Sequence, residues 1–171
     1  FVVDAFDKGS SVTIMPDKRT IVGYTTKNSG GVPDGFKNYF VLRFDHDFTY
    51  MGCVEDGKLS DGKTVSTCNH AMAVVGFHTK RGEQVNVQVA SSFISNEQAL
   101  RNLKEVEGKT FDEVKAEGRK EWNNILGRIE VEDNNIDHLR TFYSCLYRSV
   151  LFPRTFYELD EQGNPVHYSP Y

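Results

Sequence analysis

The hydrophobic pattern changes its period once along the chain, near Ser95, and this change constrains the fold more than any other feature. Before Ser95, apolar and β-branched residues alternate with polar ones in short segments bounded by turn formers, a pattern typical of half-buried strands. After Ser95, apolar residues recur at helical spacing. The sequence therefore predicts a sheet domain followed by helices.

Six strands are expected in the first part, as three sequential hairpins whose connections are short enough for antiparallel pairing. The predicted pairs are 11–15 with 20–26, 39–44 with 48–54, and 72–78 with 84–93. The glycine-rich segment 27–37 and the segment 55–63, with its two Asp-Gly pairs, are expected to be loops. The expected architecture is an antiparallel β-sandwich or an open antiparallel sheet.

Capping patterns mark where the helices begin. Ser95 and Thr110 are each followed three positions later by Gln or Glu, which is the spacing of a capping box, and Gly127 is expected to end the second helix. The third helix carries apolar residues on most sides and is expected to be largely buried. The predicted elements are helices over 95–107, 110–126 and 136–150, a short strand at 128–132, and a hairpin of 156–159 with 166–168.

The chain begins at Phe1, without a signal peptide, and stops at Tyr171, directly after the last hairpin. We interpret both ends as internal and expect the chain to be a piece of a longer protein. The predicted division is a part of a β-sandwich domain at 1–94, a helical connector with a short strand at 95–134, and the start of a truncated helical domain at 135–171.

Composition and charge exclude some classes of partner. The formal net charge is −4, whereas a nucleic-acid-binding protein needs clustered Lys and Arg to neutralise phosphates. No segment approaches the roughly 18 apolar residues of a transmembrane helix. The three cysteines are odd in number, so at least one is free or paired outside the chain. Whether Cys53 and Cys68 are bonded stays open.

No catalytic residue is predicted within the chain. The acidic residues Asp45, Asp47, Asp56, Asp61, Glu158 and Asp160 lie in predicted turns or at a hairpin, and turn chemistry explains them. A metal site or a Cys-His nucleophile is a weaker alternative, because the spacing matches neither a zinc motif nor an oriented catalytic pair. The residues weighed for these alternatives are His46, Cys53, Cys68 and His70.

The most suggestive side chains for binding follow the third helix. Aromatic faces stack on sugar rings while Arg and His donate to hydroxyl groups, so a carbohydrate cleft is expected here, with core packing as the alternative. Asn38 and Tyr39, after the glycine-rich loop, are weaker candidates. The predicted substrate-binding residues are Arg154, Phe156, Tyr157, His167 and Tyr168, with Phe152 beside them.

Several segments resemble glycoside hydrolase family 92, whose members are α-mannosidases, many acting on α-1,2 linkages. The resemblance spans nearly the whole chain. It rests on Gly23-Tyr24-Thr25-Thr26, Asn38 to Phe44, Ala90 to Ser95 with Gln98 and Ala99, Trp122 to Ile129, Phe142 to Ser149, Phe152-Pro153-Arg154, and His167 to Tyr171.

The resemblance implies an N-terminal β-sandwich joined by helices to an (α/α)6 barrel that is the catalytic domain, of which 135–171 would contain the first helix. It implies a calcium-dependent, inverting exo-mannosidase site, α-mannoside glycans as substrates, and a periplasmic, secreted or cell-surface location. The catalytic carboxylates and calcium ligands are not assigned within this chain, so the chain alone is expected to be inactive. The alternative is a non-catalytic carbohydrate-binding or structural sandwich module of another sugar-active enzyme.

Overall fold

The computed structural model describes residues 1–151 and 155–167. Their contacts divide the chain into two compact units. The first contains residues 1–107 together with the segment that begins at Tyr157, and the second contains residues 108–156. The two units are described separately.

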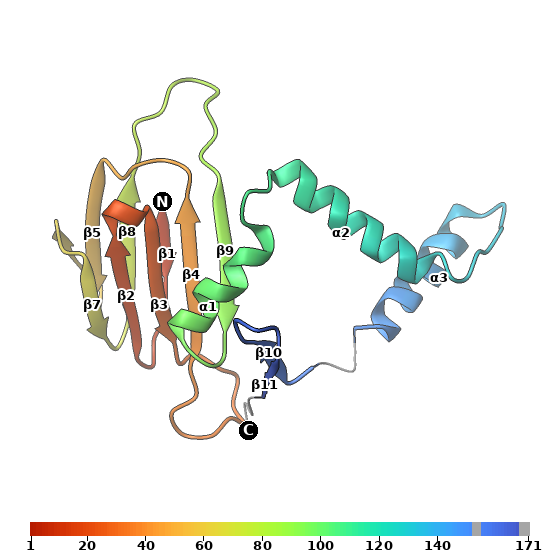
Figure 1. Cartoon of the computed structure of the whole chain (residues 1–171), viewed down its shortest axis with the longest axis horizontal. Helices are drawn as coiled ribbons and strands as arrows, with labels where there is room; N and C mark the ends of the chain where they lie inside the picture. The colour runs from red at the N-terminus through yellow and green to blue at the C-terminus, as the bar shows by residue number, and fades with distance from the viewer. Residues whose placement is uncertain (152–154, 168–171) are drawn as a thin grey trace. The chain divides into compact units, whose positions relative to one another are not determined.

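The first unit is a sandwich of two antiparallel sheets (Figure 1). One sheet has four strands in the order β1-β8-β5-β6, and the other has five in the order β7-β2-β3-β4-β9. The predicted β-sandwich is therefore confirmed. The strands are β1 (Val2–Asp4), β2 (Ser10–Met15), β3 (Thr20–Thr25), β4 (Asn38–Phe44), β5 (Tyr50–Glu55), β6 (Lys58–Asp61), β7 (Val65–Cys68), β8 (Ala71–Gly76) and β9 (Val87–Ser92), with a 3-10 turn η1 (Pro16–Lys18) between β2 and β3.

The core between the sheets follows from the alternation seen in the sequence. In β2 every second residue is buried, and the same is true of β8. Since successive side chains of a strand point to opposite faces, this alternation brings one face of each sheet together. Val12, Ile21 and Cys53 have no exposed surface, and Phe44 packs against Phe48 and Phe77 at the edge of this core.

Two of the three predicted hairpins are wrong. Only β2 and β3 pair as expected. β4 pairs with β3 and β9, whereas β5 pairs with β8 and β6, so the strands of the second and third predicted hairpins lie in different sheets. The physical reason is that their connections cross from one sheet of the sandwich to the other, as connections in β-sandwiches often do.

The segment 55–63 is also more structured than predicted. It contains β6, joined to β5 by a turn in which Asp56 and Gly57 have φ values of 48° and 89°. Positive φ at both central residues is the geometry that twists two strands into a tight hairpin. β7 follows and pairs with β2.

A short helix covers the outer face of the five-stranded sheet. It consists of α1 (Asn96–Asn102) and the 3-10 turn η2 (Leu103–Val106), close to the predicted helix (Figure 1). Ala99 and Leu103 pack on Val41 in a second buried cluster. The Ser95 hydroxyl accepts the Gln98 amide at 3.1 Å, as a cap should.

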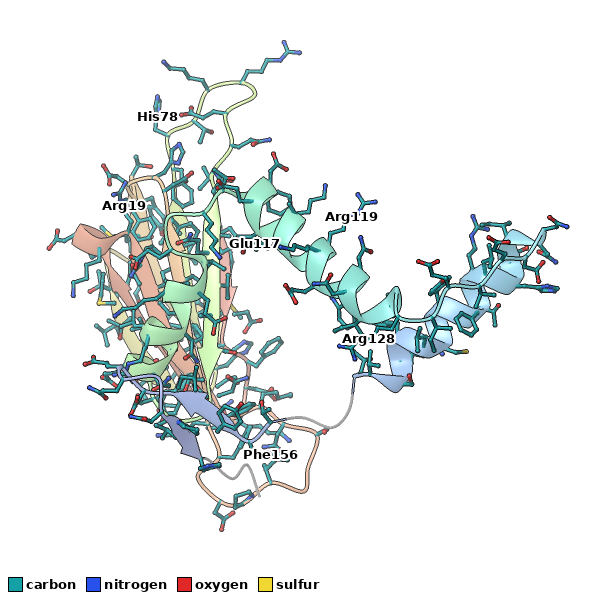
Figure 2. All side chains as sticks on the ribbon, turned by 45° about the vertical axis from the view of Figure 1, so that its right-hand side comes forward. Arg19, His78, Glu117, Arg119, Arg128 and Phe156 are labelled. Atoms are coloured by element: carbon teal, nitrogen blue, oxygen red, sulfur yellow. The ribbon has the colours of Figure 1, made fainter. Side chains whose placement is uncertain are left out.

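The second unit consists of α2 (Phe111–Leu126) and α3 (Ile136–Ser149). The predicted capping box is present, since Glu113 N–H donates to the Thr110 hydroxyl while the Glu113 carboxylate accepts the Thr110 amide at 2.7 Å. The ring of Trp122 packs on Tyr147 at a centroid distance of 4.6 Å. Side chains of α2 such as Glu117 and Arg119 project away from the helix (Figure 2).

Two predictions fail in this unit. The segment 128–132 is not a strand, because its backbone bonds to a side chain: the Tyr143 hydroxyl donates to the Ile129 carbonyl at 3.1 Å and accepts the Val131 amide at 3.4 Å. The expected burial of α3 is not seen within this chain either, since none of its residues is buried and the contacts with α2 cover it only in part.

Candidate functional site

The hairpin that carries the predicted binding residues is confirmed as β10 (Tyr157–Leu159) paired with β11 (Pro165–His167). Its turn is built around Asp160, whose carboxylate accepts the amides of Asn164 at 2.8 Å and Gln162 at 2.9 Å. The hydrogen bonds from the Asn164 backbone are the main reason why the pKa of Asp160 is lowered. For Asp160 the turn explanation is therefore right.

Glu158 was also predicted to be a turn residue, but its hydrogen-bond partners lie outside the hairpin. Its Oε1 accepts the Phe93 amide at 2.9 Å and the Ser92 hydroxyl at 3.1 Å, and its Oε2 accepts the Asn102 side-chain amide at 2.6 Å. These partners come from the end of β9 and from α1. Glu158 thus joins the hairpin to the sandwich, and the explanation by turn chemistry is wrong.

Two residues of α1 complete the attachment of the hairpin. The Gln98 side-chain amide donates to the Leu159 carbonyl at 2.8 Å and to Asn102 Oδ1 at 2.9 Å. The Arg101 guanidinium donates a hydrogen bond to Gln98 Oε1 and lies 3.4 Å from the Glu161 carboxylate. Gln98 is itself buried, with 3% of its surface exposed. Its polar atoms therefore need these partners.

The structure brings two of the predicted residues together. Tyr157 and His167 are directly opposite each other in the hairpin, with ring centroids 5.9 Å apart in an edge-to-face arrangement. Phe156 is half exposed, and its contacts assign it to the unit of residues 108–156. Arg154 and Tyr168 lie outside the described residues, as does Phe152.

A shallow groove of about 350 Å³ runs between the hairpin and the helical segment α1-η2. Charged and amide residues predominate in its lining. Its lining residues are Arg101, Asn102, Lys104, Glu105, Tyr157, Glu158, Leu159, Asp160 and Glu161.

The weaker candidates lie around a second, smaller hollow of about 180 Å³ at the glycine-rich loop. Tyr39 lines it together with Phe36 and Phe93, whose rings are 5.7 Å apart. Asn38 does not line it, and its buried Oδ1 has no hydrogen-bond partner among the described residues. The structure thus places only Tyr39 at a concave surface.

The residues weighed as metal ligands are engaged elsewhere. His46 bonds Asp45 and Glu83, and His70 bonds Asp4 at 2.7 Å. Cys53 is buried and Cys68 half-buried, and both are free thiols. Within residues 1–151 and 155–167, no three His, Cys, Asp or Glu side chains gather as ligands of a metal ion.

Sequence reasoning missed that Glu158, Gln98 and Asn102 form one set of hydrogen-bonded residues. The partners are about 60 residues apart in the chain, so no local spacing connects them. One signal was present: Glu158 lies at the centre of a strand, where its side chain and that of Tyr157 must point to opposite faces. A carboxylate at that position needs partners on the sandwich side.

Several known proteins are similar to this chain in sequence, and two of them are solved structures that are also similar in fold. The structure of the family GH92 inverting mannosidase BT2199 from Bacteroides thetaiotaomicron is 47% identical and superposes with a TM-score of 0.94, covering 99% of this chain and 23% of that one. The GH92 alpha-mannosidase BT3965 from the same species is 28% identical with a TM-score of 0.79, covering 95% and 22%. An uncharacterized secreted glycosidase from Arthroderma benhamiae is 32% identical over 78 residues, 43% of this chain and 10% of that protein.

The chain thus spans less than a quarter of the length of these relatives. No helix among the described residues is both long and apolar enough to cross a membrane. Residues 2–92 match the family described as Glycosyl hydrolase family 92 N-terminal domain, and residues 98–171 match its catalytic domain. The chain therefore belongs to glycosyl hydrolase family 92.

Proposed function

We propose that the whole protein containing this chain hydrolyses terminal α-linked mannose, with a preference for α-1,2 linkages and with inversion at the anomeric carbon. The observation that carries this proposal is the 47% identity over 99% of the chain to a structure described as an inverting mannosidase. The second relative is described as an alpha-mannosidase at lower identity, which supports the same substrate class.

Within this function, the hairpin contacts the glycan. The Tyr157 ring offers a face for the apolar side of a sugar ring, and His167 beside it offers ring nitrogens to hydroxyl groups. Inversion requires a general acid and a general base about 6.5–9.5 Å apart with a water between them. We assign neither carboxylate to this chain, and its proposed contribution is to bind and orient the substrate.

Calcium is proposed as the cofactor of the whole protein, where it would polarise the mannoside. The support is the resemblance to the family alone. The described residues offer no ligand cluster for the ion, so no step of the reaction is assigned to calcium within this chain.

We further propose that residues 1–94 form part of the sandwich domain, that 95–134 connect it, and that 135–171 begin the catalytic barrel, whose remaining helices would pack against α3. A periplasmic, secreted or cell-surface location is proposed from the family. The fungal relative described as a secreted glycosidase supports it.

The first test is hydrolysis by the whole protein, followed by NMR spectroscopy of the released sugar. We expect β-mannose as the initial product from α-1,2-mannobiose, slower release from α-1,6-mannobiose, and loss of activity with a calcium chelator that added calcium restores. Initial release of α-mannose would disprove inversion. Activity unaffected by the chelator would disprove the role of calcium, and no mannose release would disprove the activity.

The 171-residue chain alone is expected to release no mannose, and calorimetry with mannose should show almost no binding. The physical reason is that half of a site offers too few contacts to offset the entropy of association. Turnover by the isolated chain would contradict the proposal. Clear mannose binding by the isolated chain would instead favour the alternative, a carbohydrate-binding module.

A further inference from the structure

The attachment of the hairpin depends on one carboxylate more than on any other group. Among the described residues, Glu158 accepts three hydrogen bonds from groups about 56 to 66 residues earlier in the chain. Hydrogen bonds to an ionised acceptor are shorter and about twice as strong as neutral ones. The Phe93 amide and Asn102 would each lose a partner if Glu158 were removed.

The alternation of side chains along a strand connects this attachment with the direction of the side chains on the opposite face of the hairpin. Glu158 and its cross-strand neighbour Val166 are half-buried, whereas Tyr157 and its neighbour His167 are exposed. Because adjacent strand residues point to opposite faces, fixing Glu158 against the sandwich also fixes the direction in which Tyr157 and His167 point. A two-stranded hairpin is marginally stable by itself, so it depends on such an external attachment.

We propose that Glu158 is the positioning residue of the hairpin, and that its three hydrogen bonds to the sandwich hold Tyr157 and His167 in place for the mannoside. This inference rests on the proposed function in one respect, the identity of the ligand. Glu158 itself touches no substrate in this scheme and acts only through its two neighbours on the other face.

The hydrogen bonds of Asn102 require residue 158 to present an acceptor, and not a donor, to its side-chain amide. Its side-chain amide donates to Glu158 and to the Ser91 carbonyl at 2.9 Å, while its oxygen accepts from Gln98. Asn102 therefore cannot rotate its amide without losing two other bonds. In Glu158→Gln, one side-chain oxygen would keep Ser92 and Phe93, but the new NH2 group would face the NH2 group of Asn102.

The experiment compares Glu158→Ala and Glu158→Gln in the whole protein by peptide-level hydrogen exchange and by kinetics with α-1,2-mannobiose. For Glu158→Ala we expect exchange of peptides within 155–167 to be about tenfold faster, and KM about tenfold higher with kcat within threefold. Glu158→Gln should lie between this variant and the wild type in both measurements. Gln162→Ala, an exposed residue of the same turn, is the control and should match the wild type.

Three results would overturn the proposal: unchanged exchange of the hairpin in Glu158→Ala, faster exchange without a change in KM, or a fall in kcat at constant KM. Tyr157→Ala separates this inference from the proposed function, because it should raise KM without faster exchange of the hairpin backbone. If the wild type released no mannose, the proposed function would be wrong, and the exchange measurement would still decide whether Glu158 holds the hairpin.

Discussion

Gly23 and Gly118 differ in what surrounds their missing side chains. A methyl group at Gly23 would overlap the Ser11 carbonyl oxygen and the ring of Phe40, so β3 needs glycine there for close packing with both neighbouring strands. Gly118 lies in the middle of α2, and a methyl group there would meet nothing within 4 Å. Glycine at Gly118 only increases the conformational entropy of the unfolded chain.

These surroundings predict opposite effects for the same substitution. Gly23→Ala should lower the free energy of unfolding of the sandwich by about 2 kcal/mol or more, as overpacked cores do. Gly118→Ala should stabilise α2 by about 1 kcal/mol. Chemical denaturation of the 171-residue chain, followed by circular dichroism, measures both. A Gly23→Ala variant as stable as the wild type would show that the strands can move apart without cost.

The local sequence could predict the structural role of Asp160 but not that of Glu158. The carboxylate of Asp160 bonds amides two and four positions ahead, so the local sequence contains its whole explanation. Glu158 bonds groups on β9 and α1, which only the folded chain brings near. Tyr157 and His167 were predicted as binding residues because aromatic residues gather in this part of the sequence, whereas the distant partners of Glu158 cannot be read from it.

At the scale of elements, a set of polar residues ties together the β4–β5 and β8–β9 connections. We call Asp45, His46, Glu83 and Asn86 the His46 clasp. His46 bonds Asp45 at 2.6 Å and Glu83 at 3.3 Å, and Asn86 donates to Asp45 through its backbone and its side chain. The bonds to Asp45 and then Glu83 raise the pKa of His46. Burial acts to raise the pKa of Asp45, but bonds from His46 and Asn86 lower it on balance.

The clasp should make stability depend on pH. Because the pKa of His46 is raised by folding, its contribution is complete below its unfolded pKa of about 6.5 and is lost as pH rises through its folded pKa. His46→Gln should therefore lower the melting temperature of the chain at pH 5.5 and have much less effect at pH 9. Asn86→Ala removes only the side-chain hydrogen bond to Asp45 and no titrating group, so it should lower the melting temperature equally at both pH values. An equal effect of His46→Gln at both pH values would contradict this account.

The elements that the sequence predicted best are those with local causes. The Thr110 capping box and the helix after it are present because the partners are three residues apart. Strand pairing is not local: Val41 lies opposite Val22 on one side and Ala90 on the other. Alternation in the sequence fixes which side chains of a strand share a face but not which strand lies beside it. The pairing of the hairpins therefore could not be predicted.

For the molecule as a whole, the two units should differ in stability. The sandwich has a core of fully buried residues such as Val12 and Ile21, whereas α2 and α3 contain no buried residue. Free energies of local opening follow buried apolar contact. Trp122 is the one tryptophan of the chain and packs on Tyr147, so its fluorescence reports the second unit alone.

On heating the 171-residue chain, we expect the emission of Trp122 to change at a lower temperature than the β-sheet signal in circular dichroism. Leu103→Ala, which opens a cavity beneath the helical segment α1-η2, should lower the second transition and leave the first in place. A single transition shared by both signals, and shifted as one by Leu103→Ala, would show that the two units unfold together.

The order of the strands also has a consequence for how the chain folds. Five connections, those after β1, β4, β6, β7 and β8, pass from one sheet to the other. Neither sheet can therefore be completed from a continuous piece of chain. β9, an edge strand of the five-stranded sheet, is the last strand of the sandwich in the sequence. Folding that depends on such distant pairings is slow, because loops must close before contacts form. We therefore expect the sandwich to assemble in one cooperative step. The hairpin can form its hydrogen bonds with Ser92 and Phe93 only after that step.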